Sequence, residues 1–276
     1  MTKNRKTLFL TGIVLIALGV GYLSYSLVTN LARKREAERL KALAYQPKTT
    51  QESTTLPVTT EVLTTEPQTE AVTTTETKAP YVSPINFEEL WAVNPDIYAW
   101  LEIVDTDVPQ YPVLQHATDN SYYLNHTPEH DYGFPGSIFT YNVNAKDFSD
   151  FNTVIYGHRM NDGTMFSNLH DYRDEAFLKE HRIIKIYLPD RELDYTIFAS
   201  VIYDDRLITD WFDFSDPEFC EAYLDSIYGN RDLNSHILTD PPVTVEDRII
   251  TLSTCVKGQE SKRYLIVAVL TDEITE

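Results

Sequence analysis

Residues 7–28 form a stretch of 22 positions without a single charged side chain, TLFLTGIVLIALGVGYLSYSLV. As a helix that rises about 1.5 Å per residue, this stretch is long enough to cross a hydrocarbon layer of about 30 Å. A secretory signal is the alternative, because Lys3, Arg5 and Lys6 form a basic flank before it. The stretch is long for the apolar part of a signal and no small-x-small cleavage site follows it, so we predict an uncleaved transmembrane helix.

The basic residues on its two sides bear on orientation. Three precede the stretch, and five follow it: Arg33, Lys34, Arg35, Arg39 and Lys41. The positive-inside rule therefore favours a cytoplasmic C-terminal side. The segments that follow, and the activity inferred below, instead require that side to be outside. We expect a single-pass protein of the cell membrane, with residues 1–6 as a cytoplasmic basic tail and the remainder extracellular.

Two segments of different composition separate this helix from the rest of the chain. Residues 29–46 are charged and favour a juxtamembrane helix, whereas residues 47–80 consist largely of Thr, Glu, Pro and Val, with no Gly and no aromatic residue. Such a composition does not bury a core, so it predicts an extended, disordered stalk or a plain linker.

A folded unit of about 196 residues, 81–276, remains, which is enough for one core. A short helix at 87–91 is followed by eight strand-like runs with turn residues between them, a pattern typical of a mostly β, mostly antiparallel barrel. The runs are 97–104, 108–114, 137–140, 152–156, 183–188, 195–203, 248–253 and 264–270. Helical interruptions are predicted at 121–125, 165–171, 175–179 and 216–228, the last between the sixth and seventh strands.

Charge separates along the chain and excludes one class of partner. Residues 1–48 carry nine Lys/Arg and two Asp/Glu, net +7, whereas residues 81–276 carry thirteen and thirty-five, net −22. A domain with this negative charge repels phosphate backbones, and we therefore expect no nucleic-acid partner. The charge either keeps the domain soluble or attracts amine-bearing substrates. The sequence contains no metal-ligand cluster and no glycine-rich phosphate loop, so neither metal nor cofactor is expected.

Three residues at the ends of predicted strands carry the chemistry. Cys255 ends the run of the seventh strand, Arg263 begins the eighth, and His158 follows the fourth. A thiol needs a polarising partner to act as a nucleophile, which an imidazole supplies, and a guanidinium donates hydrogen bonds to a developing oxyanion. The other six histidines are expected to be solvated or loop residues. Cys220 has the helical spacing of a small core residue, and a Cys220–Cys255 disulfide is the alternative that would block this chemistry.

On these residues the chain resembles the class B sortases, membrane-anchored cysteine transpeptidases of Gram-positive bacteria. Thr251-Leu252-Ser253-Thr254-Cys255 matches the T-L-x-T-C signature of that family, Tyr156-Gly157-His158 matches the context of its histidine, and Arg263 matches its arginine. The resemblance covers about 85–271 and implies a closed eight-stranded β-barrel with an N-terminal helix and a long helix between strands 6 and 7.

The resemblance also implies a reaction. Cys255 would cleave the C-terminal sorting motif of a surface protein, NPxTx-like or related, after its threonine and form a thioester. The amine of a peptidoglycan precursor or of a pilin would then resolve that thioester. His158 and Arg263 would be the other catalytic residues. The segment between Cys255 and Arg263 departs from the pattern of many class B members, which bears on the motif more than on the reaction.

Four further residues are candidates for substrate binding. Thr254 and Ser253 precede the cysteine, and Trp211 and Phe212 flank the connection before the seventh strand. Packing is the alternative for Thr254, and a place in the core is the alternative for the two aromatic rings.

For the whole protein, an L,D-transpeptidase is disfavoured because its S-H-G-C-like run is absent. A non-catalytic stalked adhesin or wall-binding module is the alternative outside the enzymes.

Overall fold

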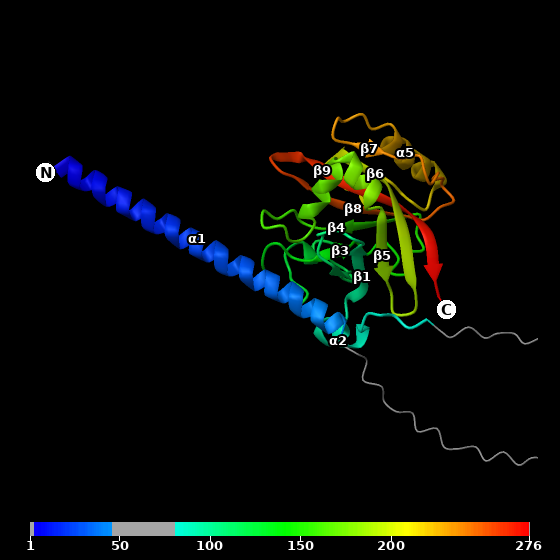
Figure 1. Ribbon diagram of the computed structural model, residues 1–276, viewed down its shortest axis with the longest axis horizontal. Coiled ribbons are helices and arrows are strands. Elements are labelled where there is room, and N and C mark those ends of the chain that lie inside the picture. The colour runs from blue at the N-terminus through cyan, green and yellow to red at the C-terminus, as the bar shows by residue number, and fades with distance from the viewer. Residues whose placement is uncertain (1–2, 46–80, 276) are drawn as a thin grey trace, which may run out of the picture.

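The computed structural model describes residues 3–45 and 81–275, with side chains from Leu15 onward in the first of these ranges. The predicted stalk, 47–80, lies outside the described residues. Helix α1 spans Lys3–Ala44, a single helix of 42 residues that projects from the rest of the molecule (Figure 1). Its part Leu15–Ala44 includes an 18-residue window apolar enough to cross a membrane, by length and composition alone. The helix passes through the charged segment after residue 28 without a break.

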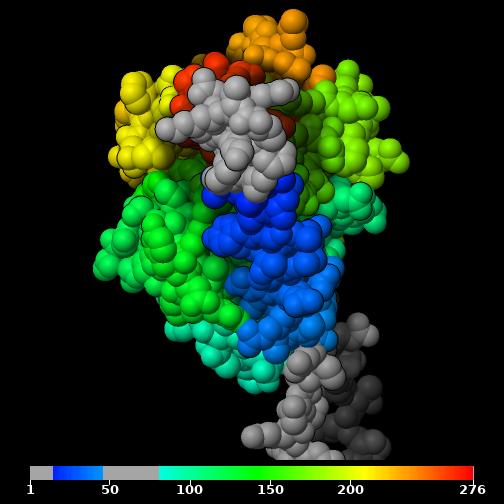
Figure 2. All heavy atoms as spheres, turned by 90° about the vertical axis from the view of Figure 1, so that its left-hand side faces the viewer, coloured from blue at the N-terminus to red at the C-terminus, as the bar shows by residue number. Residues whose placement is uncertain are grey.

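The last turns of α1 pack against the folded unit rather than leading away from it. Leu40 and Ala44 are buried beside Ile85, Leu90 and Trp100. The backbone N–H of Asn86 donates to the carbonyl of Ala44 at 2.7 Å, which joins the two described segments across the stalk. Figure 1 shows that α1 meets the barrel only with its C-terminal part, and in Figure 2, viewed from the side on which α1 projects, the lighter blue residues of this part lie next to green barrel residues.

Eight strands close into a barrel, as the sequence predicts. Around the barrel the order is β5–β1–β2–β3–β4–β8–β9–β6, and β6 pairs with β5 to complete the circle. A two-residue strand, β7, adds to the outside of β6. The strands are β1 (Ile97–Ile103), β2 (Tyr111–Leu114), β3 (Ile138–Thr140), β4 (Asn152–Tyr156), β5 (Ile183–Tyr187), β6 (Glu192–Asp204), β7 (His236–Ile237), β8 (Ile249–Val256) and β9 (Gln259–Ile274).

Most neighbouring strands are antiparallel, but two pairs, β2–β3 and β4–β8, run parallel, and the second of these concerns the site. The register of β4 and β8 pairs Tyr156 with Ser253, and each strand continues toward the same end of the barrel. His158 and Cys255 each lie two residues beyond this pair. The parallel pairing therefore brings together two residues that are almost 100 positions apart in the sequence.

Short helices occupy the connections, and one longer helix covers the barrel. They are α2 (Phe87–Val93), η1 (Tyr122–Leu124), η2 (Ser167–Arg173), α3 (Glu175–Glu180), α4 (Ile208–Trp211) and α5 (Pro217–Tyr228). Helix α5 begins where the side chain of Asp216 accepts from the N–H of Glu218, with Pro217 in the first turn. It lies between β6 and β8 in the chain, where the long helix is predicted.

The central strands are buried on both faces because α5 covers the outside of the barrel. Along β9, Tyr264, Ile266 and Ala268 belong to the cluster inside the barrel. Leu265, Val267 and Val269 alternate with them and pack in a second cluster with Tyr223 and Leu224 of α5. This two-sided burial explains why β8 and β9 appear in the sequence as continuous apolar runs.

Candidate active site where strands β4 and β8 end

Cys255 is the exposed residue at the end of an otherwise buried strand. All residues of β8 from Ile249 to Thr254 are buried, and so is Val256. Arg263 pairs directly with Cys255 across the β8–β9 ladder, and the register shifts immediately afterward. The thiol is thus held by a rigid backbone, with a guanidinium-bearing residue opposite it.

Alternation along β8 decides which face the thiol lies on. Leu252 lies in the barrel interior, whereas the hydroxyl of Thr251 hydrogen-bonds to Tyr223 of α5 at 2.8 Å. Because side chains two residues apart share a face, Cys255 belongs to the outer face that carries Thr251. Helix α5 covers this face at Thr251 but leaves it open at Cys255.

His158 is held from two sides. Its Nε2 is 3.0 Å from the carbonyl oxygen of Leu124, and its ring packs on that of Phe134 with 4.7 Å between the centroids. Burial lowers the pKa of His158, the charge of Arg263 lowers it further, and the hydrogen bond to Leu124 opposes both. A carbonyl only accepts, so Nε2 carries the proton in the neutral ring and Nδ1 is the basic nitrogen.

Gly157, which precedes His158, has no room for a side chain. A Cβ at this position would lie 2.5 Å from Cδ1 of Ile138 and 2.5 Å from Cδ2 of Phe166. Its N–H donates to the carbonyl of Ser253 at 3.1 Å, which continues the β4–β8 ladder one residue past the end of β4. The glycine thus lets the chain stay close to β8 up to His158.

Arg263 donates through Nη1 to the carbonyls of Glu260, at 2.9 Å, and Lys262, at 3.0 Å. Both acceptors belong to its own strand. These bonds hold the guanidinium near the β8–β9 turn, and after burial its charge is a smaller cause of the lowered pKa of His158. A cation here suits a negative charge that develops at Cys255.

The four predicted substrate-binding residues have different surroundings. Thr254 is 2 % exposed and alternates with Cys255, so it lies on the barrel-interior face, and its Oγ1 is buried without a hydrogen-bond partner in the described part of the chain. Ser253, 6 % exposed, shares the face of Cys255. Trp211 is exposed, with the guanidinium of Arg206 at 4.6 Å from its ring centre. Of these residues, Trp211 is exposed, whereas Thr254 and Ser253 are buried.

Phe212 lies in the core. It is 6 % exposed, and its ring packs on Tyr223 with centroids 5.3 Å apart and is stacked with Phe214 at 6.1 Å. The backbone of α4 therefore turns neighbouring rings in opposite directions, Trp211 outward and Phe212 inward. Of the two alternatives that the sequence leaves open, this environment matches the core for Phe212.

One residue of the site was not anticipated from the sequence. His170 belongs to η2, and its Nε2 lies 3.0 Å from the carbonyl oxygen of Cys255. The sequence predicts a solvated or loop histidine here, and no local pattern relates it to a cysteine 85 residues later. Only the packing of η2 against the end of β8 establishes the contact.

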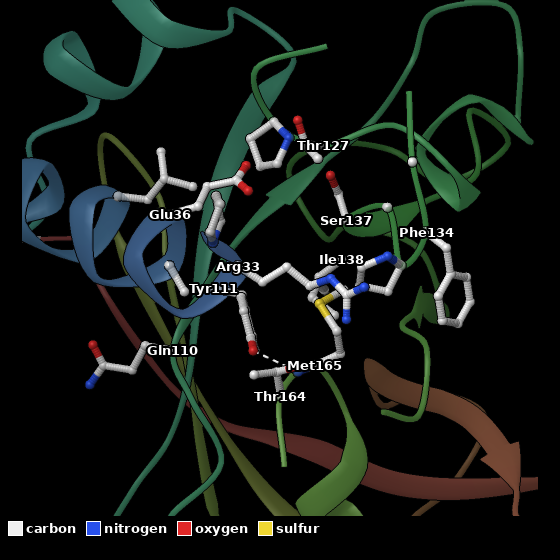
Figure 3. A pocket seen from close by; sticks show the side chains of 17 residues that line it. Arg33, Glu36, Gln110, Tyr111, Thr127, Phe134, Ser137, Ile138, Thr164 and Met165 are labelled. Atoms are coloured by element: carbon white, nitrogen blue, oxygen red, sulfur yellow. Dashed lines mark hydrogen bonds between the residues drawn. The ribbon is translucent and has the colours of Figure 1, made fainter. Parts of the chain in front are cut away.

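A cavity of about 100 Å³ lies between α1 and the barrel (Figure 3). Arg33 and Glu36 of α1 line it together with Tyr111, Phe134 and Met165. The N–H of Met165 donates to the hydroxyl of Tyr111 at 2.6 Å, the bond drawn in Figure 3. Phe134 lines this cavity together with residues of α1 and also packs on His158, so it connects α1 to the candidate site.

The three strand-end residues form a set suited to nucleophilic catalysis. An exposed thiol, a neutral imidazole with a basic nitrogen and a fixed cation supply a nucleophile, an acid–base group and a stabiliser of negative charge. Among the described residues, no group of three or more His, Cys, Asp or Glu side chains is arranged to hold a metal ion.

The known proteins that are similar to this chain belong to one family. A family model described as the sortase domain matches residues 101–271. "Sortase B" of Listeria monocytogenes is 37 % identical over 184 residues, which cover 64 % of this chain and 71 % of that protein. The structure of a Staphylococcus aureus sortase B–substrate complex is similar with a TM-score of 0.59 and 34 % identity, over 67 % of this chain and 84 % of that one.

A third similar structure is that of a Streptococcus pyogenes class B sortase involved in pilus biogenesis. Its TM-score is 0.57 and its identity 27 %, and the match covers 67 % of this chain and 97 % of that one. The range matched by the family model, 101–271, contains most of the barrel and all three strand-end residues.

Proposed function

The chain belongs to the sortase family and, within it, to class B, and from this premise we propose that Cys255, His158 and Arg263 are its catalytic residues. Members of this family are cysteine transpeptidases. The observation that carries the assignment is the register of three strands. The parallel β4–β8 pair and the antiparallel β8–β9 pair place these three residues at one end of the barrel.

The proposed reaction has two steps. The basic Nδ1 of His158 takes the proton of the Cys255 thiol, and the sulfur attacks the carbonyl carbon of the threonine in a C-terminal sorting motif, while the guanidinium of Arg263 donates to the oxyanion that forms. The peptide C–N bond breaks, His158 delivers a proton to the leaving amine, and a thioester remains on Cys255. An incoming amine then attacks the thioester, loses a proton and displaces the Cys255 sulfur.

The proposed substrates are surface proteins that carry an NPxTx-like or related motif. The similar Staphylococcus aureus structure is a complex with a substrate, which supports binding of a peptide segment at this site. The acceptor is the amine of a peptidoglycan precursor or of a pilin. The involvement of the Streptococcus pyogenes relative in pilus biogenesis supports the second source. An acidic folded unit suits both, because a protonated amine is attracted to it before it reacts.

The proposed arrangement at the membrane has residues 7–28 as the span, 1–6 inside and 81–276 outside as the catalytic domain. The length and apolarity of α1 support the span. Because α1 continues to Ala44 and packs on the barrel, the charged segment 29–46 would hold the domain close to the bilayer. Residues 47–80, for which the sequence predicts a stalk or a plain linker, connect this helix to the domain along the chain.

The test uses the full chain in detergent micelles, as wild type and as Cys255→Ala. Each is incubated with peptides of the NPxTx, LPxTG and PPxTG types and triglycine as the amine, and the products are identified by mass spectrometry. We expect cleavage after threonine and a triglycine adduct that depend on Cys255. If no peptide reacts and Cys255 also resists iodoacetamide, the catalytic assignment is wrong and a non-catalytic adhesin or wall-binding module is favoured.

A further inference from the structure

We propose that His170 is a positioning residue for the transpeptidase reaction, which it supports by holding the backbone carbonyl of Cys255. The inference rests on the proposed function, since it concerns the placement of the proposed nucleophile. His170 does not contact the reacting atoms in this geometry. It acts through the peptide group that connects Cys255 to Val256.

The first observation is the way the β4 edge of β8 is completed. The carbonyl of Ser253 accepts from the N–H of Gly157 at 3.1 Å. In a strand, carbonyls two residues apart point to the same side, so the carbonyl of Cys255 points to the side where β4 would continue. The chain has left that side after Gly157. The imidazole Nε2 of His170 lies at the next position, 3.0 Å from the Cys255 oxygen.

The second observation is that the backbone needs support at this point. The β8–β9 register shifts between Cys255 and Val256, and the turn that follows contains Gly258 with φ of +72°. Cys255 is therefore the last residue of the regular ladder. Without the His170 bond, its carbonyl would be left to water, and the peptide plane that orients the thiol would gain freedom.

The third observation is that His170 is itself fixed. Its ring is stacked on Tyr264 with centroids 4.8 Å apart, and Tyr264 pairs with Thr254, the residue before the nucleophile. The Nδ1 atom is buried and has no hydrogen-bond partner in the described part of the chain. The ring thus packs on Tyr264 with Nε2 at the carbonyl of Cys255.

The protonation state agrees with this role. Burial lowers the pKa of His170 to about 4; the hydrogen bond to the Cys255 carbonyl opposes this shift, and the charges of Arg173 and Arg159 add to it. At neutral pH the ring is therefore neutral. Its proton lies on Nε2, because the carbonyl only accepts, and it adds no charge next to the thiol. His158 and His170 thus use the same atom on a carbonyl, one to orient a base and the other to orient the nucleophile's backbone.

Positional errors of this kind are expensive in catalysis, since a misplacement of about 1 Å can cost on the order of 10²-fold in rate. The test compares His170→Ala with His170→Gln, whose side-chain amide is neutral and able to donate to the same carbonyl. The control is His236→Ala. Nε2 of His236 lies 2.7 Å from the carbonyl oxygen of Arg173, so that variant loosens the same 3₁₀ helix without touching Cys255.

Each variant is measured as the full chain in micelles, with the peptide on which the wild type is active and triglycine. We expect His170→Ala to lower kcat by about 10- to 100-fold with KM changed less than about twofold. His170→Gln should recover to within about fivefold of wild type, and His236→Ala should stay within about threefold. Alkylation of Cys255 by iodoacetamide should change less than about twofold in every variant, because a small diffusing reagent does not require an aligned thiol.

Three results would overturn the inference: unchanged kcat in His170→Ala, equal losses in the Ala and Gln variants, or an equal loss in His236→Ala. The proposed function fails differently, by the absence of any Cys255-dependent product from the wild type. If His170→Ala does not fold, ¹⁵N NMR of histidine-labelled wild type decides instead. The expected His170 signal is a neutral ring with the proton on Nε2 at pH 7, and a proton on Nδ1 would contradict the assignment.

Discussion

The two cysteines of the chain lie in regions that treat the same side chain in opposite ways. Cys220 lies on the buried face of α5, is 4 % exposed, and its thiol donates to the carbonyl of Phe214 at 3.4 Å. Cys255 ends β8 and is exposed. Both are free thiols, so the disulfide considered from the sequence is not formed in this structure.

The difference comes from the element that carries each residue. In α5 the apolar spacing directs Cys220, Tyr223, Leu224 and Ile227 toward the barrel, so the cysteine serves as a small core residue, as its spacing predicts. Burial and the charge of Asp216 raise the pKa of the Cys220 thiol, which disfavours its reactive thiolate. At the end of β8 the covering helix stops short, so strand alternation exposes Cys255 opposite Arg263. Reactivity therefore follows from position in the fold and not from residue type.

The sharpest way to break this comparison is to remove each thiol. Cys255→Ala should reduce transpeptidation below detection, a loss of at least about 10⁴-fold, since no other described group replaces the nucleophile. Cys220→Ala should keep kcat within about twofold and lower the free energy of unfolding by about 1 kcal/mol, because it leaves only a small cavity. Turnover and urea denaturation measure the two effects. Residual activity in Cys255→Ala would contradict the comparison.

Substitution of His158 and Arg263 tests whether the surroundings of Cys255, and not its exposure alone, make it reactive. We expect His158→Ala and Arg263→Ala each to lower kcat/KM by about 10²- to 10⁴-fold, because one loses the proton donor and the other the oxyanion cation. Arg263→Lys should recover little, since an ammonium does not reproduce the guanidinium geometry.

The matched control is Arg248→Ala. Arg248 lies just before β8 at the opposite end of the strand and pairs with Glu273. Its loss should change kcat/KM less than about threefold. A comparable loss in that variant would show that charge in general, and not Arg263, matters.

Alkylation tests the same comparison without any substrate. Iodoacetamide should modify Cys255 at least about 100-fold faster than Cys220 in the folded protein, because one thiol is exposed and the other is buried. In urea the two rates should converge within a few-fold. Peptide mapping by mass spectrometry gives both rates in one sample. Equal rates without urea would mean that α5 does not protect Cys220.

The smallest expected effect concerns pH. The pKa of His170 is about 4 in the folded state and about 6.5 when unfolded, so between these values the unfolded chain binds more protons. The free energy of unfolding should therefore fall as pH falls from about 6.5 to 4. The contribution is on the order of 1 kcal/mol once solvent screening at this partly exposed site is allowed for.

The measurement is urea denaturation of wild type and His170→Gln across that range. Because His158 and the carboxylates titrate in both proteins, the difference between the two curves isolates His170. The free energy of unfolding should depend less steeply on pH in His170→Gln than in the wild type. Parallel curves would show that His170 is not buried as a neutral ring.

Much of the fold is legible in the sequence because strands and helices differ in the period of their apolar residues. The eight runs become eight barrel strands, and Asp216 and Pro217 start α5 where the sequence indicates. What the sequence does not contain is the direction of pairing. Nothing in residues 152–156 or 248–253 indicates that they run parallel, since β4 and β8 are adjacent only in the closed sheet. The docking of α1 was missed for a similar reason, because Leu40 and Ala44 are ordinary apolar positions until the barrel meets them.

The sequence by itself determined the kinds of elements, the apolar helix at the N-terminus and three chemically suited residues at strand ends. These follow from local patterns, which a chain carries before it folds. Tertiary structure decided which face of β8 Cys255 occupies, that Phe212 is core while Trp211 is exposed, and that His170 meets the carbonyl of Cys255. Each of these depends on contacts between segments far apart in the chain, and their geometry is set only when the barrel closes.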